Sequence, residues 1–263
     1  MRARALLAAV AALVLLAACG QATDQATDAT GDSGGDVTAE GVEGTVTIYA
    51  AASLQAAFTE VIAAFEALNP SAFVDPPVYD GSSTLVTQLT EGAQADVFAS
   101  ADEANMDDLV AAGLNDGDPQ LFATNTLVIA VAPGNPLGIE DLTDLADLDY
   151  AVCAPEVPCG SATTELFALD GIDLNPVSQE QNVTAVAERV ASGEVDAGLV
   201  YATDVATRTD TMEAVVPSAA DEVVNRYPIA TLSGATDASQ AFVAFVLSDD
   251  GQAVLAEYGF GAP

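Results

Sequence analysis

The chain lacks histidine and tryptophan entirely, and only five of its 263 residues are basic. Without histidine, Ser-His-Asp and Cys-His catalysis and histidine-ligated metal sites are excluded. The basic residues stand against 40 acidic ones, which gives a formal net charge of -35. Binding to nucleic acid or to an anionic membrane face needs clustered Lys and Arg, so we expect neither. A hydrophobic content of 51% predicts a globular fold rather than a disordered acidic chain.

The N-terminus has the features of a secretory signal. Arg2 and Arg4 precede an unbroken apolar run from Ala5 to Ala18, which is shorter than the ~20 residues of a transmembrane helix. Leu16-Ala17-Ala18-Cys19 then resembles the lipobox of bacterial lipoproteins, in which the cysteine becomes the lipidated N-terminus. The alternative is an ordinary signal peptide with an incidental cysteine. We expect a lipoprotein signal at 1–18 and an extracytoplasmic protein that is anchored to the cell membrane only through lipid on Cys19.

Residues 19–44 hold the lipidated cysteine and a segment of Gly, Thr, Asp, Ala and Gln without apolar periodicity. This composition predicts a disordered acidic tether. With the signal removed, the 40 acidic residues face three arginines, Arg189, Arg208 and Arg226.

Three cysteines occur in the chain, and lipidation of Cys19 leaves Cys153 and Cys159 as a pair. They are six positions apart and would lie outside the reducing cytosol, which predicts a disulfide. The alternative is a soft metal site, for which two thiols with no histidine are a poor ligand set.

From residue 45 onward, short β-rich runs alternate with amphipathic helices. Strands are expected at 46–50, 73–79, 96–99, 126–132, 150–153, 197–201 and 227–232. Helices are expected at 53–68, 85–92, 103–112, 161–169 and 183–193, with two more at the C-terminus. Repeated strand–helix units predict an α/β fold with mostly parallel sheets flanked by helices. About 220 residues are many for one such sheet, so two lobes with a cleft between them are expected.

Hydroxyl side chains stand at three places where a strand passes into a helix: Ser53, Ser82-Ser83-Thr84 and Ser161. Ligands of α/β sheets gather beyond the carboxyl ends of the strands, where helix N-termini favour an anion. For each serine alone, the simpler interpretation is an N-cap that contributes ~1 kcal/mol to its helix. Several such ends in a chain without other chemistry favour a shared anion site.

Acidic pairs such as Asp107-Asp108, Asp221-Glu222 and Asp249-Asp250 are the other candidates for chemistry. Solvated surface charge explains them, and no nucleophile–base pair or metal cluster can be assembled. We therefore expect a binding protein without a cofactor and not an enzyme.

Seven motifs in unbroken order resemble the periplasmic molybdate-binding proteins of ABC transporters, a group within the type II solute-binding proteins. The motifs are Ala50–Leu54, Gly81–Leu85, Glu91–Asp102, Pro155–Gly160, Asn182-Val183, Gly198–Tyr201 and Tyr258–Phe260. The resemblance covers residues 45–263. It implies a two-lobed periplasmic binding protein type II fold, with lobe one at 45–124 plus 231–263 and lobe two at 125–230. It also implies a monomer whose partners are the permease and ATPase components of an ABC transporter.

The resemblance further implies an oxyanion held in the cleft by neutral donors. Ser53 and Ser82 would donate hydroxyl and backbone N–H bonds from lobe one. Lobe two would supply the backbone N–H groups of Cys159 and Val183 and the hydroxyl of Tyr201. The family commonly has alanine where this chain has Cys159, but a backbone contact tolerates the change.

Molybdate, and tungstate with it, is the ligand that the resemblance implies. Molybdate is an unprotonated dianion at neutral pH, so it needs donors and no acceptors, and none of the five matched positions is acidic. Sulfate has the same charge and shape but is smaller. A receptor for sulfate or another tetrahedral oxyanion, or a sensor lipoprotein that feeds no permease, are therefore the alternatives.

Overall fold

The computed structural model describes residues 41–263. The predicted signal at 1–18, the lipidation site Cys19 and most of the predicted tether lie outside the described residues. The predicted end of the tether is wrong by two residues, because strand β1 (Glu43–Val46) already begins at Glu43. In residues 41–263 no helix combines the length and the apolar character needed to cross a membrane.

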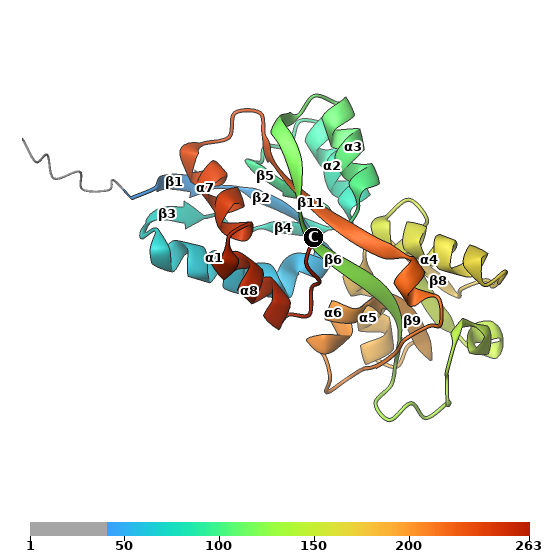
Figure 1. Ribbon diagram of the computed structural model, residues 1–263. Coiled ribbons are helices and arrows are strands. Elements are labelled where there is room, and N and C mark those ends of the chain that lie inside the picture. The colour runs from blue at the N-terminus through green and yellow to red at the C-terminus, as the bar shows by residue number, and fades with distance from the viewer. Residues whose placement is uncertain (1–40) are drawn as a thin grey trace, which may run out of the picture. The chain divides into compact units, whose positions relative to one another are not determined.

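A nine-stranded mixed sheet forms the centre of the fold (Figure 1). Its first half contains the parallel strands β4 (Val78–Asp80), β2 (Ile48–Ala51) and β5 (Val97–Ala99). Its second half contains the parallel strands β8 (Ser178–Glu180), β7 (Tyr150–Cys153) and β9 (Ala197–Tyr201). We call these halves, with their helices, lobe one and lobe two.

Two long antiparallel strands, β6 (Asn115–Val131) and β11 (Val224–Leu232), join the lobes. β11 pairs with β5 of lobe one, and β6 pairs with β9 of lobe two. β10 (Glu213–Val215) also pairs with β6 in lobe two, whereas β1 pairs with β3 (Ser71–Val74) in a separate ribbon. The predicted lobe boundaries at 124/125 and 230/231 fall inside β6 and β11.

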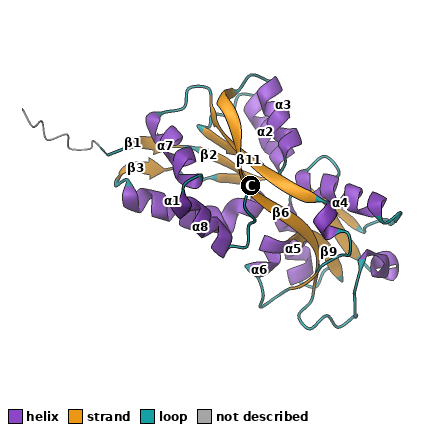
Figure 2. Ribbon diagram, viewed as in Figure 1, coloured by secondary structure: helices purple, strands orange, loops and turns teal. Residues whose placement is uncertain are grey.

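Helices flank both halves of the sheet (Figure 2). Lobe one carries α1 (Gln55–Leu68), α2 (Ser82–Thr90), α3 (Glu103–Ala111), α7 (Asp237–Val246) and α8 (Asp249–Glu257). Lobe two carries α4 (Pro158–Leu169), α5 (Val183–Ala191) and α6 (Ala202–Ala206). Short 3-10 turns lie at Ala52–Leu54, Leu142–Asp147 and Ala220–Glu222.

Aromatic side chains fill the core of lobe one under α1 and α7. The Phe58 ring lies 6.0 Å from that of Phe122 and 6.1 Å from that of Phe242, centroid to centroid. Phe65 packs edge-on against Phe242 at 5.3 Å. Such edge-to-face pairs add to the stability that burial of the rings already provides. They hold α1 in place directly after the 3-10 turn that contains Ser53, the first predicted site residue.

Two predicted strands are wrong as single elements. The predicted strand 46–50 is interrupted at Thr47, whose N–H donates to the Asp96 carboxylate at 2.7 Å instead of to a neighbouring strand. The predicted strand 73–79 is split into β3 and β4, with Pro76 and Pro77 between them. Proline has no N–H to donate, so it interrupts the ladder.

Two other predicted elements are real but begin earlier than expected. β6 starts at Asn115 rather than at 126, because β11 provides a partner for residues that carry no strand pattern of their own. α4 starts at Pro158 rather than at 161, with proline at the first helical position, where its missing N–H costs nothing.

Cys153 and Cys159 are joined by a disulfide, with their Cα atoms 5.6 Å apart. The bridge links the end of β7 to the first turn of α4. Gly160 belongs to the same turn, and a Cβ atom there would come within 1.8 Å of the Ala154 carbonyl oxygen. Glycine at this position therefore allows the helix to start directly against the strand it follows.

Candidate functional site

One small cavity between the lobes brings together all five residues that the sequence predicts as ligand contacts. Ser53 and Ser82 reach it from lobe one, and Cys159, Val183 and Tyr201 reach it from lobe two. Its volume is ≈ 10 Å³, measured as space for the centre of a water-sized atom, about the least that holds one water. In this conformation the cavity leaves no room for an organic ligand.

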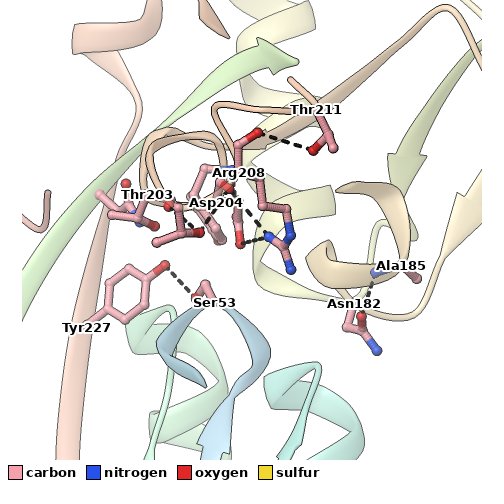
Figure 3. Close-up of polar contacts among 11 residues, drawn as sticks. Ser53, Asn182, Ala185, Thr203, Asp204, Arg208, Thr211 and Tyr227 are labelled. Atoms are coloured by element: carbon pink, nitrogen blue, oxygen red, sulfur yellow. Dashed lines mark hydrogen bonds and ion pairs between the residues drawn. The ribbon is translucent and has the colours of Figure 1, made fainter. Parts of the chain in front are cut away.

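Ser53 lies in the 3-10 turn between β2 and α1, with 7% of its surface exposed. Its Oγ is 3.0 Å from the Tyr227 hydroxyl, which reaches it from β11 (Figure 3). When Tyr227 donates this bond, the Ser53 hydroxyl proton is free to donate to a ligand. Tyr227 is itself fully buried, and burial raises its pKa above the usual value for tyrosine. The Tyr227 hydroxyl therefore stays protonated and remains able to donate a hydrogen bond to Ser53.

Ser82 is the first residue of α2 and is completely buried. The backbone N–H of Ala101 donates to its Oγ at 3.0 Å. The Ser82 oxygen thus already accepts one hydrogen bond, and its hydroxyl proton remains available to donate to a ligand. The Ser82 amide belongs to the first turn of α2, which has no intrahelical acceptor.

Lobe two presents two helix N-termini to the cavity. Cys159 is in the first turn of α4, and Val183 is the first residue of α5. Their backbone N–H groups also have no intrahelical acceptor, and the helix dipole adds positive potential at both places. Both residues are buried, with 3% and 2% of their surfaces exposed. Two buried helix starts that converge on one cavity favour an anion.

Tyr201 ends β9 and completes the cavity with a hydroxyl that has no hydrogen-bond partner among residues 41–263. Its ring centroid is 6.0 Å from that of Tyr227, and the residue is 1% exposed. Burial, with the nearby groups Tyr227, Asp102 and Asp204, raises the pKa of Tyr201 well above its usual value. The hydroxyl thus stays protonated. An unpaired buried polar group costs ~1–3 kcal/mol, a cost that a bound acceptor would remove.

The interpretation of the serines as N-caps is wrong. Neither Ser53 nor Ser82 caps a helix with its side chain; the residue before α2 is Gly81. Ser161 lies inside α4, is exposed, and lines a different groove. Ser53 and Ser82 therefore have hydroxyls directed to other contacts, and Ser161 is no part of the cavity.

The carboxylate of Asp80, at the end of β4, also lines the cavity. Asp80 was not among the residues predicted from the sequence. Its Oδ1 accepts hydrogen bonds from the Gly81 N–H at 2.8 Å and from Asn182 Nδ2 at 2.9 Å. No arginine of residues 41–263 lines this cavity. The arginines pair instead with carboxylates elsewhere: Arg189 with Glu180 and Glu194, Arg208 with Asp204, and Arg226 with Glu103. The donors of the cavity are thus all neutral.

The acidic pairs Asp107-Asp108, Asp221-Glu222 and Asp249-Asp250 are exposed on the surface. Within residues 41–263, no group of three or more Cys, Asp or Glu side chains could hold a metal ion. A larger groove of ≈ 430 Å³ shares Ala52 and Ser53 with the cavity, but it is lined by Glu188, Asp204 and Arg208. Its two carboxylates make it a poorer place for a dianion.

Asp204 lies at the start of α6, buried next to the site (Figure 3). Burial raises its pKa to about 6, although Arg208 and the Tyr201 N–H, which donates to it at 3.1 Å, act in the opposite direction. The sequence offered no sign of this group. Asp80 and Tyr227 act through partners that only the fold brings close, whereas Asp204 is held by its sequence neighbours Tyr201 and Arg208.

Comparison with known proteins gives a consistent family. Residues 46–261 match the family described as bacterial extracellular solute-binding protein. The molybdate-binding protein ModA of Mycobacterium tuberculosis is 47% identical over 223 residues, which cover 83% of this chain and 85% of that protein.

Two solved structures show the same fold. The periplasmic molybdate-binding protein of Azotobacter vinelandii matches with a TM-score of 0.73 at 20% identity, over 83% of this chain and 99% of that one. The sulfate-binding protein SubI of Mycobacterium tuberculosis matches with a TM-score of 0.67 at 20% identity, over 82% and 86%. The expected two-lobed periplasmic binding protein fold is confirmed. These relatives are solute-binding proteins and not enzymes, and this chain belongs to the bacterial extracellular solute-binding protein family.

Proposed function

We propose that this protein captures molybdate, and tungstate with it, and delivers the oxyanion to the permease of an ABC transporter. One observation supports the proposal above all. The five donors expected from the family motifs line a single small cavity, in which the buried Tyr201 hydroxyl has no partner among the described residues. The identity of 47% to a protein named for molybdate binding supports the same ligand.

The chemistry of the cavity suits a tetrahedral dianion that carries no proton. The Ser82 hydroxyl accepts from the Ala101 N–H, so its proton can be donated to the ion. The Ser53 hydroxyl can donate in the same way when Tyr227 donates to it. Asp80, the one carboxylate of the lining, already accepts two hydrogen bonds. A protonated oxyanion such as hydrogen phosphate would need an acceptor for its own proton.

Sulfate has the same charge and geometry as molybdate, so the donors alone do not separate the two. Selectivity must come from the fit between the ion and the cavity. The match to a sulfate-binding protein at 20% identity supports the fold only. A direct comparison of the ions is therefore the decisive measurement.

Thermal unfolding of residues 41–263 with molybdate, tungstate, sulfate and phosphate tests the proposal. A ligand present at 100 times its dissociation constant stabilises the folded state by ~2.7 kcal/mol. We expect molybdate and tungstate to raise the unfolding temperature at micromolar concentrations that leave sulfate and phosphate without effect. No shift with any of these ions would refute the receptor function, and equal shifts with sulfate and molybdate would refute the selectivity.

The proposed site of action is the outer face of the cell membrane, with Cys19 as the lipid anchor. Cys19→Ser should move the protein from the membrane fraction to the soluble fraction when the full chain is expressed in a bacterial host. Retention of the variant in the membrane fraction would contradict lipidation at Cys19.

A further inference from the structure

Two short segments on opposite sides of the cleft touch beside the cavity. Asp80 ends β4 in lobe one and Gly81 follows it, whereas Gln181 and Asn182 precede α5 in lobe two. Asn182 Nδ2 donates to Asp80 Oδ1 at 2.9 Å although the two residues are 102 positions apart. We call these four residues the clasp.

The side-chain amide of Asn182 is held in one orientation. Its Oδ1 accepts the N–H of Ala185 at 3.0 Å and so caps α5 (Figure 3). The NH₂ group of Asn182 is then directed to Asp80. An ionised aspartate has no hydrogen-bond donor and acts only as an acceptor. On the other side, the Gly81 N–H fixes the Asp80 carboxylate at 2.8 Å. Each partner is thus positioned by its own lobe before the two meet.

Gly81 provides an independent sign that the lobes meet here. Its backbone angles are φ −60° and ψ 136°, which any L-amino acid adopts, so the turn itself does not require glycine. A Cβ atom at Gly81 would come within 2.2 Å of the Gln181 carbonyl oxygen and 3.1 Å of Val157 Cγ1. Both atoms belong to lobe two. Glycine at this position therefore permits the approach of the lobes.

The position of Asp80 in the lining is unfavourable for a dianion by charge alone. An acceptor is needed there for Asn182, however, and a carboxylate accepts more strongly than a neutral group. The hydrogen bond across the cleft is also partly buried, and burial makes it worth more than a hydrogen bond on the open surface.

We propose that the clasp is the contact that holds the two lobes closed over the bound oxyanion, with Asp80 as its positioning residue. The identity of the ligand rests on the function proposed above, whereas closure of the lobes by the clasp does not. Asp80 acts through the acceptor it offers to Asn182, whereas the repulsion between its charge and the bound anion opposes binding.

Three variants separate these effects. Asp80→Asn removes the charge and keeps an acceptor oxygen, Asp80→Ala removes both, and Gly81→Ala adds a methyl group between the lobes. Controls are Asp107→Ala, which removes an exposed charge on α3, and Gly41→Ala, where an added Cβ atom meets nothing within 4 Å. Each variant is made in the full-length protein, and circular dichroism verifies that it is folded.

The first readout is the dissociation rate of molybdate, measured by rapid dilution. We expect Asp80→Ala to release the ion about tenfold faster or more, the loss expected for a hydrogen bond to a charged group. Asp80→Asn should release it no faster than the unchanged protein. If both Asp80 variants held molybdate equally well or more tightly, the carboxylate would act only through its charge and the proposal would fail.

The second readout needs no ligand. Small-angle X-ray scattering of the ligand-free protein should give a larger radius of gyration for Asp80→Ala and Gly81→Ala than for the unchanged chain and both controls. Equal radii would overturn the clasp whichever ion binds. A difference in radius together with no response to any oxyanion would instead refute the proposed ligand and leave the clasp standing.

Discussion

Single hydroxyl groups determine whether the cavity can donate hydrogen bonds to an anion. The Ser82 Oγ accepts from the Ala101 N–H at 3.0 Å, and the Ser53 Oγ lies 3.0 Å from the Tyr227 hydroxyl, which can donate to it. With these acceptor roles filled, both serine protons can be donated to whatever fills the cavity. Tyr201 contributes a third hydroxyl, which burial keeps protonated. The donors of this site are therefore neutral and complementary to an ion that only accepts, and Asp80 is the one charged group of the lining.

Ser53→Ala and Ser82→Ala test the contribution of these hydroxyls. Each substitution should weaken molybdate binding by ~1–3 kcal/mol, because the buried anion loses one donor. Isothermal titration calorimetry measures the change. Ser161→Ala is the matched control, since Ser161 is exposed on α4 and lies outside the cavity. Losses of only a few tenths of a kcal/mol in both serine variants would show that the hydroxyls do not contact the ligand.

The residues differ in how visible they were in the sequence. Ser53, Ser82 and Tyr201 stand in local motifs whose order and spacing resemble a known family, so they could be predicted. Asp80 and Asn182 are 102 positions apart, and Ser53 and Tyr227 are 174 apart. Nothing local marks such pairs. Tyr227 in particular stands in an apolar strand, where it is indistinguishable from an ordinary core residue.

At the scale of elements, the junctions between strands and helices carry the site. The disulfide between Cys153 and Cys159 ties the end of β7 to the start of α4, whose first turn presents the Cys159 amide. In the chain-entropy account, a disulfide that closes so short a loop stabilises the folded state by roughly 2–3 kcal/mol. The bridge thus fixes the turn that presents the Cys159 amide to the cavity.

The element boundaries that sequence analysis placed wrongly have local causes. Pro76 and Pro77 divide the predicted strand 73–79, a signal that was present and was outweighed by the neighbouring apolar residues. The extension of β6 to Asn115 could not be predicted, because its N-terminal part contains Gly117 and Pro119 and depends on pairing with β11. Tertiary partners decide such a strand, not its own composition.

The junction between β9 and α6 places a buried carboxylate beside the cavity, and its effect depends on pH. Asp204 has its pKa raised by burial to about 6, above the ~3.9 of an unfolded chain. Between these values the folded state binds more protons than the unfolded state, so the contribution of Asp204 to stability falls as pH rises from 4 to 7. The fall amounts to up to about 3 kcal/mol.

Urea unfolding of the unchanged chain and of Asp204→Asn at pH 4.5 and pH 7.5 measures this effect. Asparagine keeps an acceptor for the Tyr201 N–H and cannot titrate, so all other carboxylates cancel in the comparison. The unchanged chain should lose stability relative to the variant as pH rises. A difference that stays constant between the two pH values would contradict the raised pKa.

At the scale of the whole molecule, the strong negative charge opposes the proposed ligand. The chain holds 40 acidic residues against five basic ones. The three arginines of residues 41–263 pair with carboxylates, and none of them lines the cavity. Neutral hydroxyls and helix N-termini must therefore outweigh the distant charges once the ion is inside. This is feasible because charges farther than the Debye length, ~8 Å at physiological ionic strength, are largely screened.

Approach of the ion from solvent is a different matter, because an incoming dianion meets the repulsion of the whole surface. Added salt screens that repulsion, so the association rate of molybdate should rise with ionic strength, the reverse of attractive steering. Stopped-flow measurements from 10 to 300 mM NaCl (about 30 to 6 Å of Debye length) test this. The dissociation rate should change far less, since it depends on contacts inside the closed cavity. Replacing the exposed pair Asp107 and Asp108 by Asn should reduce the salt dependence of the association rate. An association rate of the unchanged protein that falls with salt would contradict the prediction, because it would mean that the cleft attracts the ion through a local positive field.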